Sequence, residues 1–199
     1  MDSDYHNTKK VKRHKKEKKV KKKEKRHKDA IEALAILNKN RITDKVHLLI
    51  VGGGEADKIA MLKNRVHQLG LNDHVHFLGS QQDVRLYYKA ASLFTLTSES
   101  ETFSLAALEA MAFGLPAVVT NVGGAAEMIT DYENGFLVSP RDPEKIADGW
   151  KKALSHPFDS SAIRKQVVDY FSIDQMVNNY LQVFSTIVNQ SSTSKILHS

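Results

Sequence analysis

The sequence predicts an α/β fold in which helices cover both faces of a parallel, doubly wound sheet. Short apolar runs, typical of strands buried on both faces, alternate along the chain with helical segments. The first of these runs is almost continuously apolar and ends at three glycines, as a buried strand that enters a tight loop does. The strands are expected at residues 46–51, 74–78, 93–96, 117–120 and 135–138.

The composition is that of one globular domain. With 199 residues the chain is long enough for a full core, and its 41% hydrophobic and 26% charged residues are ordinary values. The absence of cysteine excludes disulfides, thiolate metal sites and a cysteine nucleophile. Because the sequence has neither a membrane-spanning apolar run nor a signal-peptide pattern, a cytoplasmic protein is expected.

The charge is concentrated at the N-terminus. Residues 1–28 hold fourteen Lys or Arg against four Asp or Glu, a net charge of +10, so the chain's total of +6 leaves −4 for the remainder. Such a segment buries too little apolar area to fold and is predicted to be a disordered basic tail. It is interpreted as a solvated tail. The alternative is attachment to an anionic membrane surface, peripheral to the inner membrane. Nucleic-acid binding is not expected, because no aromatic residues are interleaved with the lysines.

The helices follow from apolar periodicity and from their stop signals. Apolar residues at helical spacing predict a first helix that ends near Lys39, and Pro143 opens another. An amphipathic stripe marks the last helix, which is expected to end near Asn189. The domain is therefore expected to span residues 29–189, with a polar tail at 190–199. The helices are expected at about 30–39, 56–69, 83–91, 105–113, 125–129, 143–154, 161–170 and 173–188.

Residues 97–116 carry the densest signal. From 105 to 113 Glu109 is the only polar side chain, and the Gly-Leu-Pro that follows supplies a stop, so a buried helix with a buried carboxylate is predicted. That carboxylate needs partners, and the hydroxyls of a bound ligand are natural ones. Glu101 lies in the polar loop before the helix. Both carboxylates are therefore expected near one helix N-terminus, where free N–H groups favour a phosphate.

This stretch resembles the signature of the retaining, nucleotide-sugar-dependent glycosyltransferases of the family-4 type, in the C-terminal, donor-binding half of their GT-B fold. The matching residues run from Ser98 through Glu101, Phe103, Leu105 and Glu109 to Gly114 and Pro116. The resemblance covers roughly residues 25–189 and implies a Rossmann-like domain. Four further stretches match in the right order: Ile50-Val51-Gly52-Gly53-Gly54, Val75-His76-Phe77-Leu78-Gly79, Val122-Gly123-Gly124 and Asn134-Gly135-Phe136-Leu137-Val138.

The resemblance implies roles for both carboxylates. Glu101, as a catalytic residue, would contact the donor sugar, and Glu109 would contact the ribose of the nucleotide. The backbone N–H groups of Phe103, Ser104 and Leu105 would meet the diphosphate, with no metal or other cofactor. For Glu109 the alternative is a buried acid satisfied by the protein itself. Hydrolysis by paired carboxylates fits less well, because a glycosidase needs neither the helix N-terminus nor the glycine loop.

Two glycine turns are expected beside these residues. Gly52 and Gly53 follow a buried strand and allow close backbone approach to a nucleotide, although a plain tight turn is the alternative. By resemblance, the backbone near Gly79 passes the base, whereas on its own this stretch is simply a strand end. His74 and His76 would share one face of a strand, but no third zinc ligand is evident and no metal site is predicted.

The resemblance also implies features that this chain lacks. The related domains begin with a strand, followed by an Arg and a Lys that neutralise the diphosphate leaving group. Lys25 fits the Lys position and is a catalytic candidate, but no Arg stands near Val20. In a doubly wound sheet of order 3-2-1-4-5-6 the first strand is central. Because a lysine-rich segment is too charged for that position, the first strand is predicted to be missing, with the remaining five flanking a gap or an improvised replacement.

The resemblance implies the function of a donor-binding half. It would bind a nucleotide-diphosphate sugar for retaining transfer of a hexose to a sugar, lipid or polymer acceptor. The acceptor-binding N-terminal domain is missing, so the chain is expected to be incomplete alone and to be complemented by a separate acceptor-binding chain. Two alternatives stay open: a non-catalytic sugar-nucleotide-binding remnant, and an interaction protein whose basic tail binds polyanions.

Overall fold

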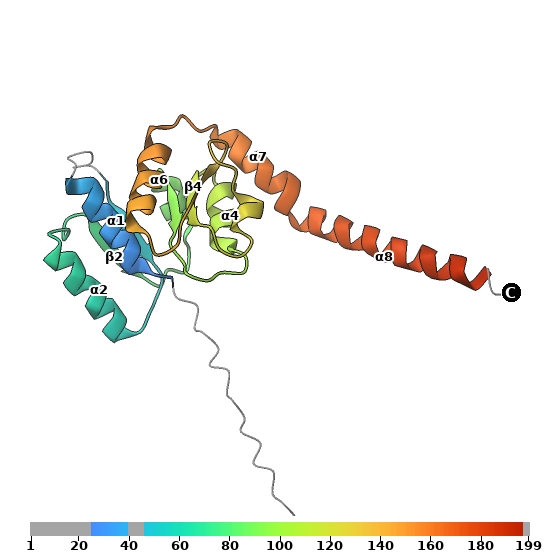
Figure 1. Ribbon diagram of the computed structural model, residues 1–199, viewed down its shortest axis with the longest axis horizontal. Helices are drawn as coiled ribbons and strands as arrows, with labels where there is room; N and C mark the ends of the chain where they lie inside the picture. The colour runs from blue at the N-terminus through green and yellow to red at the C-terminus, as the bar shows by residue number, and fades with distance from the viewer. Residues whose placement is uncertain (1–24, 40–45, 197–199) are drawn as a thin grey trace, which may run out of the picture.

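The computed structural model describes residues 25–39 and 46–196, in which helices and strands alternate (Figure 1). Helix α1 begins at His27, inside the segment predicted to be a tail, of which residues 1–24 lie outside the described residues. The elements are α1 His27–Lys39, β1 Leu48–Val51, α2 Ala56–Gln68, β2 Val75–Gly79, α3 Arg85–Ala90, β3 Phe94–Leu96, α4 Leu105–Ala112, β4 Ala117–Thr120, α5 Ala125–Met128, β5 Gly135–Val138, α6 Pro143–Ser155, α7 Ser160–Phe171 and α8 Ile173–Ile196.

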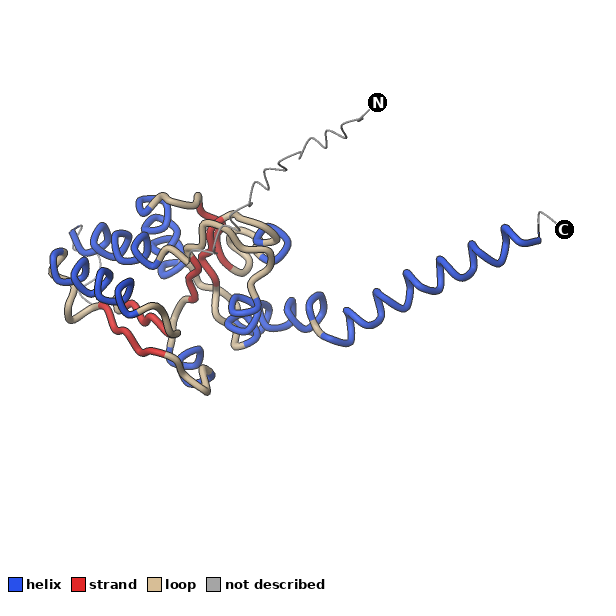
Figure 2. The backbone as a smooth tube through the Cα atoms, turned by 90° about the horizontal axis from the view of Figure 1, so that it is seen from below, coloured by secondary structure: helices blue, strands red, loops and turns tan. Residues whose placement is uncertain are grey.

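The strands form two parallel sheets rather than one. Strand β1 pairs with β2, with Leu48 opposite Val75, and a second sheet has the order β3-β4-β5, with Val118 of β4 between Thr95 and Phe136. Figure 2 shows the two groups of strands apart from one another. The α/β class with parallel strands is confirmed. Within the described residues no strand lies between the two sheets, and the segment to which the prediction of a missing first strand applies lies outside those residues.

One apolar core contains residues of both sheets and joins them. Helices α1 and α6 pack against each other, and their buried side chains contact residues of both sheets. Leu34 of α1, Leu48 of β1, Val118 of β4 and Trp150 of α6 all belong to this cluster. A second core lies under α4, α5 and α7 and contains Met111, Val119, Met128 and Ile163. The helices therefore hold the sheets together where strand pairing does not.

Side-chain caps explain where several helices begin. The Ser104 hydroxyl accepts a hydrogen bond from Ala107 N (3.2 Å) at the start of α4. Asp142 accepts one from Lys145 N (3.0 Å) and is followed by Pro143, which favours the first turn of α6. These caps fix the helices that follow β3 and β5.

Helix α8 extends away from the rest of the protein (Figures 1 and 2). It continues to Ile196, so the expected end near Asn189 was wrong. Its predicted stripe is present but uncovered: Ile173, Tyr180 and Phe184 are 75%, 58% and 59% exposed. None of the helices in residues 25–39 and 46–196 is both long and apolar enough to cross a membrane.

Candidate functional site at the sheet edge

The residues predicted to bind the donor lie in the loops that follow β1, β2 and β3 and at the start of α4. Because all the strand pairs are parallel, the carboxyl ends of the strands within each sheet meet at one edge. In open α/β sheets ligands bind outside this edge. The described loops and the first turn of α4 therefore form the candidate site.

The two predicted glycine turns contact each other. Gly52 N donates a hydrogen bond to Gly79 O (2.8 Å), and both residues have positive φ values, +128° and +68°. A Cβ atom on Gly53 would lie 2.7 Å from the Ser80 hydroxyl. The structure thus brings Gly52, Gly53 and Gly79 together at the ends of β1 and β2, where the positive φ values of Gly52 and Gly79 favour glycine.

The loop that carries Glu101 is held by the glycines that follow β4. Gly124 N donates to Thr102 O (2.7 Å), and a Cβ atom on Gly123 would lie 1.9 Å from the Glu101 carbonyl oxygen. The Phe103 ring packs against Phe171, with ring centroids 5.8 Å apart. The 101–104 loop is therefore held in place by the glycines that follow β4 and by α7. It leads directly into the N-terminus of α4.

Glu109 is exposed, so the predicted burial of this carboxylate was wrong. Helix α4 buries only the face with Ala107, Ala110 and Met111, while Leu105 is 69% exposed. The Glu109 carboxylate accepts a hydrogen bond from the Tyr88 hydroxyl (3.2 Å). Burial, followed by the Glu109 charge and this hydrogen bond, raises the pKa of Tyr88 to about 12. Glu109 thus has a protein partner and still faces solvent, as a ligand-binding carboxylate can.

Lys25 lies at the end of β3. Its side chain is exposed, and its carbonyl oxygen accepts a hydrogen bond from the Thr97 hydroxyl (2.9 Å), which also reaches Arg26 O (3.1 Å). Thr97 directly follows β3, so Lys25 stands at the same end of that strand as the Glu101 loop.

The sequence did not predict the network of arginine and carboxylate side chains at this edge. Arg26 binds Asp29 through Nε and Nη2 at 2.6 and 3.0 Å and lies 3.6 Å from Glu99, which also accepts from Arg141. Both arginines have positive φ values, +47° and +60°, which are unfavourable for residues other than glycine. No periodicity or spacing marks these residues, because the contacts join three separate segments.

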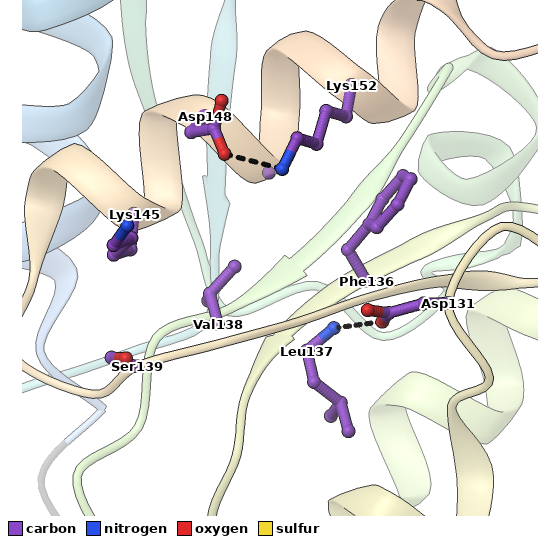
Figure 3. Close-up of a pocket in the computed structure, with 9 residues that line it drawn as sticks. Asp131, Phe136, Leu137, Val138, Ser139, Lys145, Asp148 and Lys152 are labelled. Carbon is purple, nitrogen blue, oxygen red and sulfur yellow. Dashed lines mark hydrogen bonds and ion pairs between the residues drawn. The ribbon is translucent and has the colours of Figure 1, made fainter.

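Neither of two cavities near the sheet has room for a nucleotide sugar. The larger, about 170 Å³, lies between β5 and α6, and Figure 3 shows Asp131, Lys145, Asp148 and Lys152 around it. Lys152 Nζ lies 2.8 Å from Asp148, so part of its charge is already paired. The smaller, about 10 Å³, lies beneath the Glu101 loop. Ligand pockets typically measure about 300–1,000 Å³, so the predicted donor residues line an open edge.

His76 of β2 and His74, just before this strand, meet a third histidine near the other end of the strands. His47 Nδ1 lies 3.1 Å from His76 Nε2, and the His47 ring stacks on both His74 and His76 at 5.3 Å. Within the described residues, no group of three His, Cys, Asp or Glu side chains has the geometry of a metal site.

The fold and this open edge define a Rossmann-like domain of the GT-B glycosyltransferase class. Residues 18–169 match the family described as glycosyl transferases group 1, and the chain belongs to this family. It is 33% identical over 165 residues to the D-inositol 3-phosphate glycosyltransferase of Gordonia bronchialis, covering 78% of this chain and 36% of that protein. It is 32% identical over 150 residues to an uncharacterized glycosyltransferase of Methanocaldococcus jannaschii, covering 72% and 38%.

Solved structures agree with this assignment. Anabaena HepE, crystallised in complex with UDP-glucose, is 26% identical with a TM-score of 0.71, covering 81% of this chain and 45% of that one. The C-terminal domain of a group 1 glycosyl transferase from Francisella tularensis is 28% identical with a TM-score of 0.64, covering 75% and 80%. The chain spans less than half the length of the curated relatives it matches, with 31%, 38% and 44% covered in three of them.

Proposed function

We propose that this chain is the donor-binding half of a retaining glycosyltransferase and binds a nucleotide-diphosphate sugar at the open sheet edge. The observation that carries the proposal is the N-terminus of α4, with Glu101 in the loop before it and Glu109 exposed on its surface. An α-helix leaves the N–H groups of its first turn without intrahelical partners, and its dipole favours negative charge there. The UDP-glucose complex of the similar HepE protein supports this choice of ligand.

Each candidate residue has a role in this proposal. Glu101 orients the sugar and Glu109 the ribose through hydrogen bonds to hydroxyls. The N–H groups of Phe103, Ser104 and Leu105 receive the diphosphate, and Lys25 supplies a positive charge. The turns at Gly52, Gly53 and Gly79 lie against the nucleotide, since no side chain blocks the backbone there.

The proposed reaction also needs a surface that binds the acceptor. Transfer of a hexose breaks the bond between the anomeric carbon and the diphosphate oxygen and forms one to an acceptor hydroxyl, whose proton leaves with the departing phosphate. The helix N-terminus and Lys25 stabilise the leaving diphosphate without a metal, but placing the acceptor requires the other side of a cleft. We propose that a separate acceptor-binding chain supplies it, and the uncovered apolar stripe of α8 supports such a partner. The acceptor is a sugar, lipid or polymer.

Calorimetric titration of the purified full chain with a panel of nucleotide sugars tests the donor site. We expect one of them, such as UDP-glucose, to bind equally well with and without EDTA. Glu109→Ala should weaken that binding at least tenfold, because hydrogen bonds to a charged group are worth about 1.5–3 kcal/mol.

Glu133→Ala is the matched control. Glu133 is an exposed carboxylate that precedes β5, at the opposite end of the strands from the candidate site, and its loss should leave donor affinity unchanged. Absence of binding by a chain that unfolds cooperatively would contradict the proposal. Attachment to a membrane or to other polyanions through the basic tail depends on residues 1–24, which lie outside the described residues, and remains a separate proposal.

A further inference from the structure

The structure contains two strand edges without ladder partners among the described residues. Strand β1 pairs only with β2, and β3 pairs only with β4, so the other edge of each carries backbone N–H and C=O groups that no described strand meets. Ser98, two residues after β3, also holds a hydroxyl that is buried and lacks a hydrogen-bond partner within the described chain. Buried polar groups are normally satisfied, so these groups call for an occupant.

Helix α1 shows that the two edges belong to one gap. Its first residues are bound to the end of β3 through Thr97, and the helix then packs on β1 and on α6. Trp150 of α6 donates from its indole to the Thr95 hydroxyl on β3 (2.9 Å). Helix α1 thus contacts β1 and the end of β3, and α6 contacts β3. The chain turns from Lys25 into α1 at the place where a strand between β1 and β3 would end.

The occupant has to be apolar on both faces. On β3, Thr95 contacts the core that includes Trp150, whereas Phe94 and Leu96 pack against the second core under α4. A strand inserted beside β3 would alternate between the same two apolar clusters. Strands buried on both faces are nearly continuous in apolar residues.

The residues that precede Lys25 do not meet this requirement. In residues 18–24 only Val20 is uncharged, and burying unpaired lysines costs several kcal/mol for each ion. The sequence directly before Lys25 therefore lacks the apolar residues that a strand buried on both faces needs.

We propose that the gap between β1 and β3 accepts an extended apolar segment from a partner chain, which pairs in parallel with both strands and completes one continuous sheet. This inference rests on the proposed function, because the partner it describes is the acceptor-binding chain. The segment spans about four residues, the length of β1, and is rich in β-branched side chains. Main-chain hydrogen bonds would supply affinity and the two apolar clusters would supply selectivity.

A synthetic peptide tests the gap directly. The probe is the neutral peptide Gly-Ser-Val-Ile-Val-Val-Ser-Gly, added to the full chain, with binding followed by fluorescence anisotropy and amide hydrogen exchange. We expect saturable binding that slows exchange in β1 and β3 but not in β5. Proline in place of the isoleucine removes a ladder N–H and should weaken binding at least tenfold. Equal binding of the proline peptide, or protection elsewhere, would overturn the proposal.

Filling the gap from within the chain is the second test. The triple variant Lys21→Val, Lys22→Ile, Lys23→Val should raise Tm by about 4 °C or more and abolish binding of the peptide. The control Lys9→Val, Lys10→Ile, Lys12→Val makes the same charge change far along the sequence and should do neither. No binding of the peptide by the wild-type chain together with an unchanged Tm in the triple variant would refute the gap.

Donor binding separates this inference from the proposed function. Titration of the wild-type chain with the same panel of nucleotide sugars reports on the edge at α4 alone. Peptide protection without donor binding would retain the gap as a strand-accepting site and reject the donor role. Donor binding with neither peptide protection nor a higher Tm in the triple variant would reject only the gap.

Discussion

Gly123 determines where the Glu101 loop can lie, because a methyl group at this position would collide with the Glu101 carbonyl at 1.9 Å. Gly123→Ala should therefore push the loop away from α4 and destabilise the fold by about 2 kcal/mol or more. Donor affinity should fall in parallel. Urea unfolding and calorimetric titration measure the two effects.

Gly70→Ala separates the collision from the strain of a left-handed backbone. Gly70 also has a positive φ, +68°, but nothing lies within 4 Å of the place that a methyl group would occupy there. This variant should lose only about 1 kcal/mol and keep its donor affinity. If both variants behave alike, the close approach at Gly123 has no special effect.

His27 reports on the charge at Lys25. Burial, and to a smaller extent the positive charge of Lys25, lower the pKa of His27 below 6.5. The neutral ring therefore contributes stability that is present above pH 6.5 and is lost as the pH falls. Lys25→Met should raise this pKa, though not to 6.5 because burial persists, and an NMR titration of the ring would detect it. An unchanged pKa would place Lys25 away from His27.

The same ring tests the proposed diphosphate position. A diphosphate held at Lys25 brings negative charge close to His27 and should raise its pKa on addition of UDP-glucose. In Lys25→Met the ligand-induced shift should shrink as affinity falls. Binding with no shift of the His27 resonance would show that the diphosphate lies elsewhere.

At the scale of single elements, helix α8 should contribute little to the stability of the rest of the protein. Phe184 is 59% exposed, so Phe184→Ser should change the free energy of unfolding by about 0.5 kcal/mol or less. Ile163 of α7 is 1% exposed, and Ile163→Ala should cost about 2–5 kcal/mol. Urea titration compares the two. A large loss for Phe184→Ser would mean that α8 packs on the domain in solution.

Most elements could be predicted because their apolar spacing is local. Strands β4 and β5 have the predicted bounds, and α2, α4 and α6 differ by one residue at one end. Glu109 was misjudged for a physical reason: a run of Ala, Leu and Met has no polar face to mark which side meets solvent. The contacts of Glu99 with Arg26 and Arg141 join distant segments and leave no local pattern. The end of α8 was placed too early because polar residues can continue an unsupported helix.

At the scale of the whole molecule, α1 should couple the two sheets energetically. Leu34 is fully buried in the core cluster that contains residues of both sheets. Leu34→Ala should therefore cost about 2–5 kcal/mol and speed amide exchange in β1–β2 and in β3–β5 alike. Hydrogen exchange resolved by segment measures this. Faster exchange in only one sheet would mean that the sheets unfold independently.

The two strand edges that no described residue pairs with also bear on whether copies of the protein self-associate. An open edge in one copy is a template for the same edge in another, which makes edge-to-edge aggregation the main hazard of this fold. The lysine-dense stretch ends at Lys25, beside β3, so copies that approach through this gap bring two strongly positive segments together. The repulsion is screened within about 10 Å at 0.1 M salt. The protein should therefore stay monomeric in dilute buffer and self-associate as ionic strength rises, the reverse of an assembly held by ion pairs.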